Sequence, residues 1–171
     1  MIQKSIAMKV IILTSLLALL LAPELKAQAS PPVHNNVKVL NPGKGYMNSL
    51  NTRALRDFLK KYENAADVVW YAVKDGFVVR FRVDSTHGRS AYDKRGQWIY
   101  TIKQYSEKFM PRDVRHIVKS SYYDYAITLV EEIEQPNHPV RYLVHMQDEV
   151  SWKNVLISDR NMELVEDKKK L

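Results

Sequence analysis

The stretch VVWYAVKDGFVVRFRV, residues 68–83, decides the fold class because two apolar-rich runs flank the dipeptide Asp75-Gly76. This dipeptide between alternating runs is a strong signal for a β-hairpin. Every second residue from Phe77 to Val83 is apolar, whereas Arg80 and Arg82 lie between them. The second strand of the hairpin is therefore expected to have an apolar side and a cationic side.

The neighbouring sequence extends this hairpin into a small α+β unit. Before it, residues 51–64 place apolar side chains at helical spacing, and Asn51 or Thr52 can cap the helix. After it, the stretch AYDKRGQWIYTI, residues 91–102, holds two short apolar runs around a charged turn. Gly96 can supply the positive φ that this turn needs. One helix and four strands are expected before residue 105.

The same order of elements follows in the rest of the chain. Pro111 precedes a second helical pattern, and strands are expected at residues 125–133, 140–146, 152–157 and 162–165. This predicts a tandem repeat, about 51–104 and 111–166, followed by a charged tail at 167–171. We expect an α+β fold in which each repeat contributes a helix and a four-stranded antiparallel sheet. Both helices are expected to pack on one face of a joint sheet, which leaves the opposite face open.

The first 29 residues have the features of a secretory signal. Lys4 and Lys9 precede an apolar run of about a dozen residues, and Ala27-Gln28-Ala29 resembles a cleavage site. A retained anchor is the alternative, but a membrane-spanning helix needs about 20 apolar residues. We expect cleavage near Ala29, a flexible leader at 30–50 with one short strand at 37–40, and a periplasmic or secreted mature chain without a transmembrane segment.

Composition limits the chemistry of the mature chain. Removal of three basic residues and one acidic residue with the signal lowers the formal charge from +7 to +5, a mild excess that favours acidic partners. This charge and the expected export argue against nucleic-acid binding. The sequence has no cysteine, so it can form neither a disulfide nor a catalytic thiol.

No motif indicates an enzyme. The stretch Asp84 to Gly88 contains an acid, a hydroxyl and an imidazole, but neighbours in a turn point apart, so we interpret it as a turn. His138 and His145 belong to no metal-binding motif. We therefore predict a non-enzymatic protein with no catalytic residue, no metal and no cofactor.

Spaced positions between Leu55 and Val165 form a further pattern. They are Asn64-Ala65 after the first helix, Val69-Trp70 in the first strand, Ala91-Tyr92-Asp93 with Gly96 and Trp98 in the hairpin, and Pro111 and Tyr122 around the second helix. This pattern resembles the PepSY-like periplasmic domains, whose fold is similar to beta-lactamase-inhibitor protein. The chain departs from the family at Arg95, where Asp or Asn is expected, and by an insertion at Ser85–Arg89. The resemblance implies a binding module and supplies no site residue.

The candidate binding residues are cationic and aromatic side chains expected on the open face of the sheet. They are Arg80, Arg82, Lys103, Arg141, His145 and Trp152. Such residues suit a protein interface. They also suit an ordinary solvated sheet face that prevents aggregation, and tryptophan equally suits a core.

Two functions remain open at this point. The first is an exported module that binds an envelope or secreted protein with an acidic surface, as an inhibitor or accessory of envelope enzymes would. The second is a binder of a small anionic ligand, lipid or glycan in the cell envelope.

Overall fold

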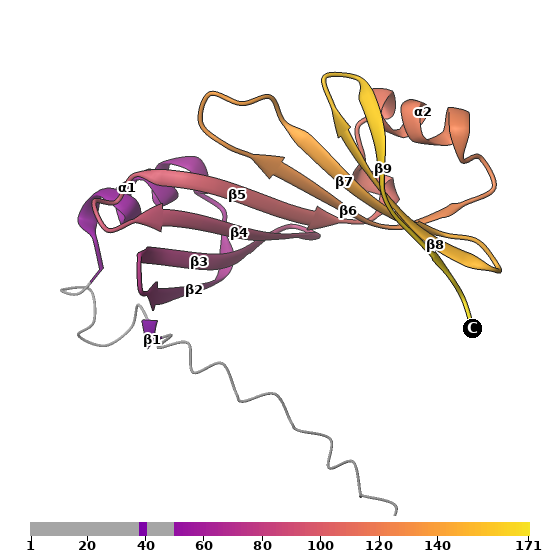
Figure 1. Cartoon of the computed structure of the whole chain (residues 1–171). Helices are drawn as coiled ribbons and strands as arrows, with labels where there is room; N and C mark the ends of the chain where they lie inside the picture. Colours follow the sequence, from indigo (N-terminus) through magenta and orange to yellow (C-terminus); the bar gives the residue numbers. More distant parts are fainter. Residues whose placement is uncertain (1–37, 41–49) are drawn as a thin grey trace, which may run out of the picture. The chain divides into compact units, whose positions relative to one another are not determined.

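The computed structural model describes residues 38–40 and 50–171 (Figure 1). The expected signal at 1–29 lies outside the described residues, as does the expected leader at 30–50 apart from one short strand and Leu50. The helices are α1 (Thr52–Lys61) and α2 (Arg112–Ser121). The strands are β1 (Lys38–Leu40), β2 (Ala66–Val73), β3 (Gly76–Val83), β4 (Thr86–Asp93), β5 (Trp98–Tyr105), β6 (Ala126–Glu134), β7 (Arg141–Gln147), β8 (Ser151–Ser158) and β9 (Asn161–Lys169).

The strands form one nine-stranded antiparallel sheet in which their spatial order equals their order in the chain. β5 pairs with β6 through Thr101–Tyr105 opposite Val130–Glu134, and this ladder joins the strands that follow α1 to those that follow α2. The predicted α+β fold with an antiparallel sheet and two helices is therefore confirmed. The short β1 adds a strand beside β2.

Local sequence explains both helices. The Asn51 side chain accepts hydrogen bonds from the backbone N–H groups of Arg53, at 2.9 Å, and Ala54, at 3.4 Å, as an N-cap does. Lys60 and Lys61 lie in the last turn of α1, where the helix dipole favours cations. α2 begins directly after Pro111.

Both helices lie on the same side of the sheet. The Phe58 ring of α1 packs against Phe81 of β3, with 5.1 Å between the ring centroids. From Phe81, directly opposed residues continue across the sheet through Gly88, Lys103 and Glu132 to Tyr142. Opposed residues of an antiparallel ladder point to the same side. Tyr142 packs against the cluster that contains Val118 of α2, so α2 covers the same face as α1, as Figure 1 shows.

Two hydrophobic clusters form the core, one under each helix. Under α1, Phe58 packs with Trp70, Val79, Phe81 and Tyr92. Under α2, the cluster contains ten buried residues, among them Val114, Val118, Val130, Val144 and Val155. Trp70 is fully buried and serves as a core residue.

Two boundaries differ from the sequence prediction. β4 begins at Thr86, so the residues that were expected to form an insertion at 85–89 mostly belong to a strand. β9 continues to Lys169, so most of the expected charged tail at 167–171 is also strand. In both places polar side chains replace the apolar alternation that would have marked a strand.

Candidate binding face

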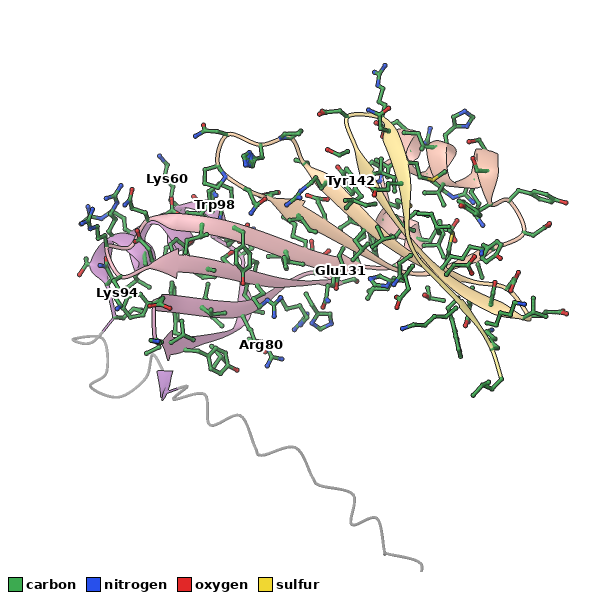
Figure 2. The ribbon with its side chains drawn as sticks, viewed as in Figure 1. Lys60, Arg80, Lys94, Trp98, Glu131 and Tyr142 are labelled. Atoms are coloured by element: carbon green, nitrogen blue, oxygen red, sulfur yellow. The ribbon has the colours of Figure 1, made fainter. Side chains whose placement is uncertain are left out.

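The face of the sheet opposite the helices is called the open face here. Two rows of directly opposed residues define it. The first row runs from Arg80 through Arg89, Ile102 and Ile133 to Arg141, and the second runs from Arg82 through His87, Gln104 and Glu131 to Leu143. Figure 2 shows Arg80 on the side of the sheet away from Trp98 and Lys60, which lie on the helix side.

A hollow of about 600 Å³ lies on the open face over β2 to β5. The side chains of Val69, Tyr71, Ile102 and Gln104 line it together with a group of cations. These cations are Arg80, Arg82 and Arg89, and the imidazole of His87 lies beside them. Asp67 is the single carboxylate among the lining residues. The hollow is therefore concave and cationic, with apolar and aromatic walls.

Two of the arginines in the hollow make contacts within the described residues. The Arg82 Nε group donates a hydrogen bond of 2.9 Å to Asp67, and its Nη1 group donates one of 3.0 Å to the Asp84 carbonyl oxygen. Arg80 Nη1 lies 3.4 Å from the Tyr71 hydroxyl oxygen. Within residues 38–40 and 50–171, no ion pair or hydrogen bond reaches the side chain of Arg89 or His87, and both residues are exposed.

The open face over β6 to β9 carries apolar side chains together with Glu131, His145 and Asn154. Ile133, Leu143 and Leu156 are partly buried there. Arg141 Nη2 donates a 2.5 Å hydrogen bond to Gln135 Oε1. The buried Nε2 atom of His145 has no hydrogen-bond partner among the described residues.

Trp152 is 48% exposed at the end of β8. Its Nε1 group donates a 2.9 Å hydrogen bond to Gln147, and the Lys170 ammonium lies 5.3 Å from its ring centroid. The ring is available to solvent but lies far from the hollow along the sheet. Its role in binding remains a prediction.

The expectation that Lys103 lies on the open face is wrong. Lys103 stands opposite Gly88 and Glu132 on the helix side, where it forms ion pairs with Glu132, at 3.0 Å, and with Glu134. Burial acts to lower the pKa of Lys103, but the hydrogen bonds to Glu134 and Glu132 outweigh it and the pKa is raised. Burial likewise acts to raise the pKa of Glu132, yet the hydrogen bonds from Tyr105 and Lys103 lower it.

The structure brings together only part of the predicted set. Arg80 and Arg82 line the hollow, whereas Arg141 lies in the same row as Arg80 but four strands away. Adjacent strands are about 4.8 Å apart, so these two arginines are separated by about 19 Å. His145 lies on the same strand as Arg141, and Trp152 lies on the next strand, β8. The predicted residues are therefore not one cluster.

The residues missed from the sequence are His87, Arg89, Tyr71 and Gln104. His87 and Arg89 were assigned to a turn or insertion, whereas only Asp84 and Ser85 form the turn between β3 and β4. A signal was present, because His87 and Arg89 alternate with the small residues Thr86, Gly88 and Ser90. At position 88 the residue is glycine because the Phe81 ring occupies the space that a side chain would need.

The histidines and acids singled out from the sequence form neither a triad nor a metal-binding group in the part of the chain that the structure describes. Asp84 lies in the turn and His87 in β4, and the two residues form no hydrogen-bonded triad with Ser85. Within those residues no group of three or more His, Asp or Glu side chains could hold a metal ion. No helix among them is long and apolar enough to cross a membrane.

The fold of the chain is similar to that of several solved structures. A BLIP-like protein from Bacteroides fragilis is 20% identical to the chain with a TM-score of 0.56, and the match covers 70% of this chain and 86% of that protein. The chain has a BLIP-like fold. A DUF2874 family protein from Bacteroides ovatus is 18% identical with a TM-score of 0.56, covering 70% of this chain and 87% of that one.

A third solved structure has a similar fold. It is a proposed periplasmic protein from Bacteroides eggerthii, 14% identical with a TM-score of 0.55, and the match covers 70% of this chain and 88% of that one. No protein-family model matches the chain, and no curated protein matches it. At these identities the likenesses show the fold alone.

Proposed function

We propose that this protein is an exported, non-enzymatic module that binds the acidic surface of an envelope or secreted protein through the open face. The cationic hollow over β2 to β5 carries this proposal. It presents three arginines and a histidine against one carboxylate. Complementary charge of this kind steers association and selects partners. Arginine and tyrosine are also the residue types that most often dominate interface energies.

The BLIP-like fold supports a protein partner. The B. fragilis protein is named BLIP-like, after the beta-lactamase-inhibitor protein whose fold the sequence pattern also suggests. This chain has an antiparallel sheet with both described helices on one side, so neither of these helices covers the open face. An inhibitor or accessory of an envelope enzyme would use such a face.

Export and family membership belong to the same proposal. The basic start, apolar run and Ala27-Gln28-Ala29 of the sequence support cleavage near Ala29, and the proposed periplasmic location of the B. eggerthii protein agrees with export. The PepSY-like pattern supports membership of that family. The tandem duplication is supported by the order of elements, because a helix of ten residues precedes four strands in each half.

Affinity capture tests the proposed function. The tagged protein is incubated with an envelope extract of the source organism, and captured proteins are identified by mass spectrometry. The test variant is Arg80→Glu with Arg82→Glu, and the matched control is Arg53→Glu with Arg56→Glu, the same change of charge on exposed positions of α1. A partner that the parent and the control retain and the test variant loses supports the proposal. Equal capture by all three proteins contradicts it.

The size of the hollow also favours a second candidate, a small anionic ligand, lipid or glycan. A volume of about 600 Å³ lies within the range of small-molecule sites. This function predicts that an anionic ligand copurifies with the protein or raises its melting temperature. Absence of any such ligand, with a captured protein partner, rejects this candidate.

A further inference from the structure

The basic residues of the hollow oppose each other in pairs across β3 and β4. Arg80 of β3 lies directly opposite Arg89 of β4, and Arg82 lies directly opposite His87. Like charges in directly opposite positions of a sheet destabilise it. Elsewhere in this sheet, opposed charges have opposite sign, as in Lys103 with Glu132 and Lys153 with Asp167.

The charge of these pairs is only partly neutralised within the described residues. Asp67 binds Arg82 at 2.9 Å, whereas Arg80 and Arg89 have no carboxylate partner there. Arg80 and Arg89 therefore occupy directly opposite positions, and both line the hollow. One carboxylate placed between them could accept hydrogen bonds from both, and such charge-assisted bonds are the strongest kind.

The spacing of the two pairs matches the spacing of side chains along an extended polypeptide. Residues 80 and 82 point to the same side of β3 and are separated by about 6.7 Å along the strand. An extended polypeptide has the same spacing between alternate side chains. The walls offer Val69 and Ile102 for apolar contact, whereas the Gln104 amide group donates a 2.6 Å hydrogen bond to Glu131.

We propose that the hollow binds an extended acidic segment of the partner protein with carboxylates at alternate positions. One carboxylate bridges Arg80 and Arg89, and the next meets the Arg82–His87 pair. This inference rests on the proposed function and adds the chemistry of the recognised segment. It also explains why the sheet retains the like-charge pair Arg80–Arg89 where neutral residues would be more stable.

Fluorescence anisotropy with short labelled peptides tests the inference. In the first peptide glutamate alternates with threonine, and in its isomer the same glutamates are contiguous. The alternating peptide is expected to bind the parent more tightly than the isomer, and binding is expected to weaken as NaCl is added. Inorganic phosphate at equal ionic strength is expected to compete no better than NaCl. If phosphate displaces the peptide more strongly than NaCl does at equal ionic strength, the hollow is a phosphate site and the inference is overturned.

Two variants change the binding in opposite directions. Arg89→Glu removes a guanidinium, so the affinity for the alternating peptide should fall by about tenfold or more. The new carboxylate also gives Arg80 an intramolecular partner, so the melting temperature should rise. Asp67→Asn removes the carboxylate that pairs with Arg82, so the affinity for the same peptide should increase. Arg56→Glu on α1 is the matched control, and the affinity for the alternating peptide should not change in it. Unchanged peptide affinity in Arg89→Glu, or a lower melting temperature for it, would overturn the inference.

The capture experiment separates this inference from the proposed function. A partner that is lost with Arg80→Glu and Arg82→Glu, together with peptides that fail to bind, leaves the protein-binding function in place and rejects the extended acidic segment. Failure of both experiments rejects both proposals.

Discussion

Gly88 of β4 lies directly opposite Phe81 of β3, and a β-carbon at position 88 would come within 2.3 Å of the Phe81 ring. The ring fills the space that a side chain would need, so Gly88→Ala should force a shift of the core under α1. We expect a loss of about 1–3 kcal/mol in the free energy of unfolding, measured by urea denaturation. Ser85→Ala in the adjacent turn is the control. A loss below the error of the measurement in Gly88→Ala would show that the ring moves freely.

A buried pair of hydroxyl groups links β4 and β5. Ser90 and Thr101 are fully buried with 2.7 Å between their side-chain oxygens, and Trp98 Nε1 donates a 3.0 Å hydrogen bond to Thr101. Thr101→Val should leave the Ser90 hydroxyl and the Trp98 N–H unpaired and cost about 1–3 kcal/mol of stability. Adding Ser90→Ala should recover part of the loss. A double variant as unstable as the sum of its single variants would contradict this coupling.

The ion cluster around Lys103 is a structural element and not part of the open face. The side chains of Lys103, Glu132 and Glu134 are 26%, 17% and 24% exposed, respectively. Lys103→Met should leave two mostly buried carboxylates without their cation and cost about 2–4 kcal/mol in the free energy of unfolding. Peptide or partner binding at the hollow should not change. Lys103→Arg, which keeps the charge, is the control, and equal losses for both variants would point to packing instead.

The turn between β7 and β8 contains Asp148, whose protonation is expected to lower the stability of the protein in acid. Loss of water contact acts to raise the pKa of Asp148, but the Val150 and Ser151 N–H groups and the Tyr125 hydroxyl lower it from 3.8 to about 2. A carboxylate with a lowered pKa stabilises the fold above its unfolded pKa, and this contribution is lost as the pH falls through the folded value. Stability should therefore decline between about pH 4 and pH 2. In Asp148→Asn this decline should be smaller, as measured by thermal unfolding at each pH.

Much of the fold could be predicted from the sequence. The strands β2 and β3 carry the Asp75-Gly76 turn between strongly β-forming residues, and both helices have apolar residues at helical spacing. These local signals agree with the tertiary structure because one face of each element is buried. The open face also follows from period-two alternation once the helices are placed.

The composition of the site could be predicted only in part. β4 has small residues on its helix side, since Gly88 accommodates Phe81 and Ser90 bonds to Thr101, so its alternation is not apolar and His87 and Arg89 were missed. The side on which Lys103 lies depends on the register of β5 with β4 and on two glutamates of β6. Such long-range pairing leaves no local mark in the sequence.

Site-specific photocrosslinking tests the central claim, that the partner binds in the hollow of the open face. A photoreactive phenylalanine analogue replaces Tyr71, which lines the hollow, or Tyr123, which is 76% exposed in the turn after α2. After irradiation in envelope extract, a crosslinked protein from position 71 but not from position 123 is the result that we predict. Adducts from position 123 with none from position 71 would contradict the claim.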